Sequence, residues 1–193
     1  MIQLVLATHN LHKVKELQRI LGPSLDGIEL LAYEGPSPVE DGDSFEANAL
    51  IKARAAAAFT GLPAIADDSG ISVDALGGAP GIDSADYSGE RDDTANVAHL
   101  LAALGDAPDR AARFTCAAAL VNGTDEFVEL GIWPGTVLHE PAGPNGFGYD
   151  PIFKPAGFSV SAAELRPDEK NAISHRALAF RQLMPIVRRE LLG

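Results

Sequence analysis

Residues 63–70 have the sequence PAIADDSG, which changes abruptly from apolar to polar. The small and apolar residues 63–66 predict a short buried strand. The following DDSG favours a turn, because Asp and Ser make local hydrogen bonds and glycine permits bent backbone. Carboxylates at the end of a strand would lie at a sheet edge, where ligands of open α/β sheets bind and where hard oxygen ligands suit Mg²⁺ and phosphate. A solvated turn without a ligand is the alternative interpretation of this stretch alone.

Strands and helices alternate on both sides of this stretch. Before it, hydrophobic patterns predict strands over residues 2–7 and 28–32 and helices over residues 13–21 and 44–59. After it, we expect an apolar segment over 71–74, a helix over 92–104, and two strands over 114–121 and 127–133 joined at Asn122-Gly123. A final helix follows Ser174 and runs towards Leu192. This order predicts an α/β fold.

Composition narrows the class of protein. The chain has 193 residues, 46% of them hydrophobic, and a net charge of −12. Such an acidic chain argues against a nucleic-acid partner, which needs clustered Lys and Arg. The single cysteine, Cys116, has no internal disulfide partner. No apolar run approaches the roughly 20 residues of a membrane span, and the N-terminus has no signal-peptide pattern, so we expect a cytoplasmic protein without a membrane partner.

Cationic side chains stand at the starts of two predicted helices. Lys13 follows the polar turn THN at residues 8–10, and His175 and Arg176 follow Ser174. Cations oppose the helix dipole at these positions, so a nearby anion is expected there. Asn48 and Lys52 lie four residues apart and therefore share one helix face. For Lys13 and Lys52, the alternative is a surface lysine without a ligand.

Five motifs occur in order along the chain: THNLHK (8–13), EANALIKA (46–53, in the segment that starts at Glu40), DDSG (67–70), GFGYDP (146–151) and EKNAISHR (169–176). Together they resemble the inosine triphosphate pyrophosphatases, also called XTP/dITP diphosphatases. The likeness spans residues 2–176. It implies an α/β fold with an elongated mixed central sheet flanked by helices, in which two lobes surround a deep cleft within a single domain over residues 1–193.

The resemblance also implies a reaction. Members hydrolyse non-standard purine nucleoside triphosphates, namely ITP, dITP and XTP, to the monophosphate and pyrophosphate, and so cleanse the nucleotide pool. The implied cofactor is Mg²⁺ and the implied assembly is a homodimer. Phosphoanhydride hydrolysis needs charge neutralisation and an aligned water more than covalent chemistry, and the carboxylates and lysines of the motifs supply such groups.

The resemblance assigns a role to each motif. Glu40 and Asp68 would hold the metal, and Asp68 would also be the general base for the attacking water. The triphosphate would be bound by the first turn, which comprises Thr8, His9, Asn10, Leu11, His12 and Lys13. Two further lysines, Lys52 and Lys170, would add positive charge. The nucleoside would be bound by Ser69, Phe147 (stacked on the base), Gly148, Tyr149, Asp150, His175 and Arg176, the last three reading the edge of the base.

One departure and two alternatives accompany this reading. Asp86 stands where the family often has a basic residue that assists phosphate binding, which puts that contact in doubt. One alternative is a Maf-like pyrophosphatase acting on modified pyrimidine nucleotides. The other is a nucleotide sensor that has lost catalysis, although the presence of both Glu40 and Asp68 speaks against it.

Overall fold

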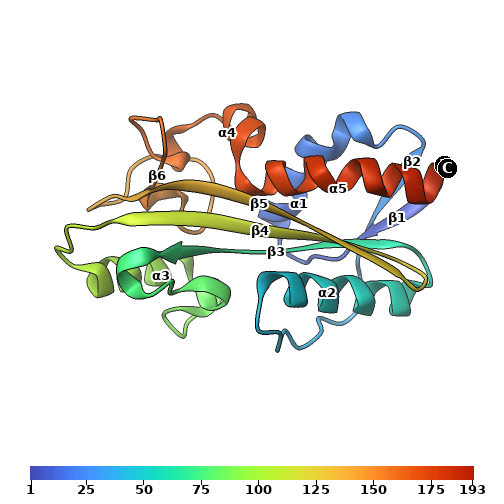
Figure 1. The fold of residues 1–193 in the computed structure, drawn as a ribbon, viewed down its shortest axis with the longest axis horizontal. Coiled ribbons are helices and arrows are strands. Elements are labelled where there is room, and N and C mark those ends of the chain that lie inside the picture. The colour runs from blue at the N-terminus through green and yellow to red at the C-terminus, as the bar shows by residue number, and fades with distance from the viewer. The chain divides into compact units, whose positions relative to one another are not determined.

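The computed structural model describes residues 1–193 and contains one six-stranded sheet flanked by helices (Figure 1). Strand β1 pairs in parallel with β2 and β3, whereas β5 and β6 are antiparallel, so the sheet is mixed. This confirms the predicted α/β class. The strand order is β2-β1-β3-β4-β5-β6, with bounds β1 Ile2–Leu6, β2 Ile28–Ala32, β3 Ala64–Val73, β4 Ala111–Asn122, β5 Asp125–Val137 and β6 Phe153–Pro155.

Five α-helices accompany the sheet, and none is long and apolar enough to cross a membrane. Local caps set their starts: the Ser44 side chain accepts the Ala47 N–H at α2, and Asp92 accepts the Ala95 N–H at α3. The bounds are α1 Leu11–Leu21, α2 Phe45–Thr60, α3 Asp93–Leu104, α4 Pro167–Ile173 and α5 His175–Leu192. The sequence patterns missed the short helix α4 and the three-residue strand β6.

The chain forms two compact units. Unit 1 comprises residues 1–68, 116–131 and 175–193, and unit 2 comprises residues 69–115 and 132–174. Strands β3, β4 and β5 contribute residues to both units. The prediction of one domain over residues 1–193 stays a prediction.

The core of unit 1 follows from the alternation of side chains along its strands. On β4, Cys116, Ala118 and Leu120 pack in one hydrophobic cluster with α1 and α5, whereas Ala117, Ala119 and Val121 pack in another with α2. The side chains of β1 alternate in the same way: Leu4 packs in the cluster with α1 and α5, and Val5 packs in the cluster with α2. The sheet of unit 1 is therefore buried on both faces, with helices α1 and α5 on one side and α2 on the other (Figure 1).

Unit 2 has an aromatic core of its own. The Phe153 ring is fully buried and lies with its centroid 4.5 Å from Phe114 and 5.3 Å from Trp133. Both contacts are edge-on, the geometry that the ring quadrupoles favour. Helix α3 covers this core with Val97 and Leu100.

The turn predicted over residues 67–70 is wrong. Strand β3 runs without a break from Ala64 to Val73, so Asp67, Asp68, Ser69 and Gly70 are strand residues, and the apolar segment predicted from residue 71 belongs to the same strand. The two carboxylates therefore lie within β3 and not at its end, just beyond Ala64 and Ile65, which pair with β1. Incorporation into the sheet outweighs the local preference of Asp, Ser and Gly for bends.

Removal of the Phe153 ring tests the unit 2 core. We expect Phe153→Ala to lower the free energy of unfolding by about 3–5 kcal/mol, because removal of a buried aromatic ring leaves a cavity in the core. Denaturant titration followed by the fluorescence of the single tryptophan, Trp133, measures this. The matched control is Phe158→Ala, where the ring is 39% exposed and the loss should be well under half as large. Equal losses in both variants would contradict this account of the core.

Candidate functional site

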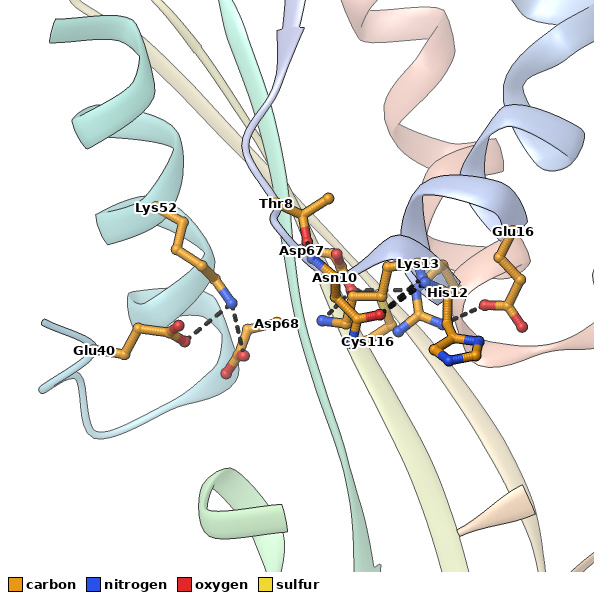
Figure 2. Close-up of polar contacts among 11 residues, drawn as sticks. Thr8, Asn10, His12, Lys13, Glu16, Glu40, Lys52, Asp67, Asp68 and Cys116 are labelled. Atoms are coloured by element: carbon orange, nitrogen blue, oxygen red, sulfur yellow. Dashed lines mark hydrogen bonds and ion pairs between the residues drawn. The ribbon is translucent and has the colours of Figure 1, made fainter. Parts of the chain in front are cut away.

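Strand β3 sends its two adjacent carboxylates to opposite faces of the sheet. Ile65 packs with α1 and α5, whereas Ala66 packs with α2. Because the side-chain period of a strand is two, Asp67 continues the Ile65 face and Asp68 continues the Ala66 face. Figure 2 shows the result, with Asp68 beside Lys52 on one side of the strand and Asp67 beside Lys13 on the other.

Two carboxylates converge on one ammonium group on the α2 face. The Lys52 Nζ lies 3.0 Å from Glu40 Oε2 and 3.0 Å from Asp68 Oδ1 (Figure 2). Lys52 comes from the middle of α2, Asp68 from β3 and Glu40 from the irregular segment that precedes α2. The structure thus brings the two predicted metal ligands to a common point, together with one of the predicted phosphate-binding lysines.

Burial sets the charge state of this cluster. It raises the pKa of Asp68 above its ordinary value, and the ammonium groups of Lys52 and Lys13 only partly oppose that shift. Burial lowers the pKa of Lys52, but Asp68, Asp67 and Glu40 outweigh it, so the pKa of Lys52 is raised. The cluster therefore holds a stable cation beside a carboxylate that binds protons more readily than an ordinary aspartate.

Asp67 belongs to a buried ion network on the opposite face. Its Oδ2 lies 3.1 Å from Lys13 Nζ on α1 and accepts a hydrogen bond from Arg176 Nε on α5 at 3.2 Å. The Arg176 guanidinium also donates to Glu16 on α1, and the Cys116 thiol lies 3.9 Å from the same Asp67 oxygen. Burial would raise the pKa of Asp67, but the charges of Lys13, Arg176 and Lys52 outweigh it and lower that pKa. Asp67 thus stays ionised and ties α1 and α5 to the sheet.

Side-chain caps order the turn before α1, next to Lys13. Asn10 caps the helix, because its Oδ1 accepts the N–H groups of His12 at 2.9 Å and Lys13 at 3.2 Å. The Thr8 Oγ1 accepts the Asn10 N–H. His9, Leu11 and His12 are exposed at this turn. The helix therefore begins two residues earlier than predicted, and its N-terminus adds a partial positive charge beside Lys13.

The predicted base-binding residues of the GFGYDP motif lie in unit 2 and surround one buried carboxylate. Asp150 Oδ2 accepts the Phe147 N–H at 3.0 Å and pairs with Lys170 Nζ at 2.7 Å. The Lys170 ammonium lies 5.0 Å from the centroid of the Phe147 ring, within cation–π range. A Cβ at Gly146 would lie 2.2 Å from the same Asp150 oxygen, so only glycine fits this approach. Asp150 and Lys170 thus fix the backbone and ring of Phe147.

Two residues that the sequence patterns did not single out also hold this loop. Asp93, in the first turn of α3, accepts the Gly148 N–H at 2.8 Å. The Tyr149 hydroxyl donates to the Ser84 carbonyl at 2.6 Å. An acidic residue in the first turn of a helix can be recognised in the sequence, but its hydrogen bond to a loop 55 residues away cannot. The loop is therefore anchored by contacts that only the fold creates.

The remaining predicted residues are placed as follows. Ser69 is half-buried in β3, and His175 is buried at the start of α5. Arg176 is 2% exposed, and its guanidinium contacts Asp67 and Glu16. The predicted contacts of His175, Arg176 and Asp150 with a base edge stay predictions. The acceptor expected beside the cations of α5 is present as Asp67 and Glu16.

Glu40 and Asp68 offer hard oxygen atoms, which suit Mg²⁺. No group of three or more His, Cys, Asp or Glu side chains is assembled anywhere in the chain. A pair of carboxylates fits Mg²⁺ in nucleotide enzymes, where one or two carboxylates and substrate phosphates complete the octahedron. The raised pKa of Asp68 also fits, since a partly buried carboxylate gains from a bound cation.

Similar proteins of known family show where this chain belongs. A dITP/XTP pyrophosphatase of Leifsonia xyli is 55% identical over 97% of this chain and 96% of that protein, and one of Streptomyces avermitilis is 53% identical over the whole of both. A solved HAM1 protein from Coxiella burnetii is 43% identical with a TM-score of 0.88, covering 98% of this chain and 100% of that one. The model of the Ham1 family matches residues 4–186. The chain therefore belongs to the Ham1 family.

Proposed function

We propose that the protein is a nucleoside triphosphate pyrophosphatase that hydrolyses dITP, XTP and ITP to the monophosphate and pyrophosphate. The observation that carries this proposal is the convergence of Glu40 and Asp68 on Lys52, with both carboxylates 3.0 Å from its ammonium nitrogen. The membership of the Ham1 family and the dITP/XTP pyrophosphatases among its relatives support the choice of substrate.

The phosphate groups are bound by cations of unit 1. Lys13 and Lys52 are both largely buried, so their charges are weakly screened and attract a polyanion strongly. The N-terminus of α1 adds the partial positive charge of the helix dipole, which favours phosphate. Glu40 and Asp68 would hold Mg²⁺, and the ion would supply positive charge to neutralise the charge that develops on the phosphoryl oxygens.

Asp68 accepts the proton of the attacking water. The water oxygen forms a bond to the α-phosphorus, the bond from that phosphorus to the oxygen that bridges it to the β-phosphoryl group breaks, pyrophosphate leaves with the bridging oxygen, and one water proton moves to Asp68. Lys52 contacts Asp68 directly and so holds the carboxylate in place.

The base stacks on Phe147 in this proposal. Phe147 offers a ring for stacking, and its backbone is held by Asp150. We include the predicted homodimer in this proposal, and sedimentation velocity would measure it.

Product analysis tests the reaction itself. Incubation with dITP and Mg²⁺ should release dIMP and pyrophosphate, and chelation of the metal with EDTA should abolish turnover until Mg²⁺ is restored. Phosphorus NMR identifies the products. Release of orthophosphate, or equal turnover of dUTP and dTTP, would contradict the proposal, because the first is a different cleavage and the second a different base class.

Asp68→Asn tests the general base. We expect kcat to fall by at least about 100-fold, since the amide cannot accept the water proton. Steady-state kinetics with dITP measure the loss, and circular dichroism checks that the variant is folded. The control Asp125→Asn, in the exposed hairpin of unit 1, should keep full activity. Normal turnover by Asp68→Asn would remove Asp68 from the mechanism.

Phe147→Ala tests the stacking platform. The loss of stacking should raise the KM for dITP by about 5–160-fold, which corresponds to about 1–3 kcal/mol for one stacked base. Phe147→Tyr keeps the aromatic face and should stay close to the unmodified protein. A KM that is the same in Phe147→Ala would place base binding elsewhere.

A further inference from the structure

We propose that Asn48 is a positioning residue, which holds the segment of residues 36–42 against helix α2 and thereby fixes Glu40 beside Lys52 and Asp68. The inference rests on the proposed function, because it concerns the metal-binding carboxylate of that site. It assigns a role to a residue outside the carboxylates and lysines of the cluster itself.

Asn48 fastens the C-terminal end of the segment. Its side chain is buried, and its Oδ1 accepts the Gly42 N–H at 2.9 Å. The approach is close, because a Cβ built on Gly42 would lie 2.6 Å from that oxygen. Lys52 follows Asn48 by one turn of α2 and contacts Glu40 at 3.0 Å. Two residues on one face of α2 therefore contact the segment: Asn48 bonds its backbone at Gly42, and Lys52 pairs with the Glu40 side chain.

Tyr33 and His9 fasten the other end. The Tyr33 hydroxyl donates to the Pro36 carbonyl at 2.9 Å, and a hydrogen bond joins His9 Nδ1 and Ser37 Oγ at 3.0 Å. The rings of His9 and Tyr33 also pack together, with centroids 5.4 Å apart. The segment is therefore tied down on both sides of Glu40.

Glu40 needs these ties because it lies in irregular backbone and its side chain is 40% exposed. Neither packing nor a helix or strand fixes its position, in contrast to Asp68 in β3. A catalytic ligand must stay within about 0.5 Å of its working geometry, and supporting hydrogen bonds provide that precision. Loss of such a supporting partner typically weakens metal binding about 10–100-fold.

The experiment compares three variants of the full chain. Asn48→Leu removes the acceptor at similar volume, and Asn48→Asp keeps an acceptor oxygen for Gly42. The matched control is Asn96→Leu, because Asn96 occupies the same fourth position of α3, is also buried, and accepts the Ser88 N–H at 2.8 Å. The probe is Mn²⁺, titrated by electron paramagnetic resonance in the presence of the α,β-imido analogue of dITP, with hydrogen exchange of the Gly42 amide as a second readout.

We expect Asn48→Leu to weaken Mn²⁺ binding at least about tenfold and to speed exchange of the Gly42 amide. Asn48→Asp should match or exceed the Mn²⁺ affinity of the unmodified protein, and Asn96→Leu should leave it unchanged. Unaltered Mn²⁺ affinity in Asn48→Leu, or the same weakening in Asn96→Leu, would overturn the positioning role.

The two proposals fail in different ways. Suppose that the unmodified protein does not cleave dITP, but that Asn48→Leu binds Mn²⁺ more weakly than it does and Asn96→Leu does not. The proposed function would then be wrong and the positioning role would stand. If dITP were cleaved normally and Asn48→Leu bound Mn²⁺ as the unmodified protein does, only the positioning role would fall. Absence of Mn²⁺ binding by the unmodified protein would overturn the metal site and this inference together.

Discussion

The two-residue period of strand β3 is the constraint on which the candidate site depends. It places Asp67 and Asp68 on opposite faces of a sheet that is covered by helices on both sides. Each buried carboxylate needs a cation, since an isolated charge in a protein interior is strongly destabilising. Helices α1 and α5 supply Lys13 and Arg176 to one, and helix α2 supplies Lys52 to the other.

The two faces give identical side chains different chemistry. Asp67 is surrounded by cations that lower its pKa, so it serves as a permanent anion that orients Lys13. Asp68 has a raised pKa because desolvation outweighs its cations. Lys13 links the two roles, because its ammonium is held by Asp67 while it stands in the first turn of α1, where phosphate binding is favoured.

Irregular segments carry the remaining functional groups, and buried polar side chains hold them. Asn48 accepts a backbone N–H from the segment that bears Glu40, and Asp150 accepts one from the loop that bears Phe147. In both places a glycine allows the close approach, as the short Cβ distances at Gly42 and Gly146 show. A single hydrogen bond from a buried side chain thus fixes the position of a loop that carries a candidate site residue.

The sequence by itself determined the features that depend on neighbouring residues: the α/β class, the helices predicted over residues 44–59 and 92–104, and the motifs that indicate the family. Tertiary structure decided the rest. Strand pairing extended β3 through a stretch whose local preference is a turn, and folding joined Arg176 to Asp67 and Glu16, which are 109 and 160 residues away. Hydrophobic periods and caps act within one or two turns, whereas ion pairs between distant segments exist only once the sheet and helices have packed.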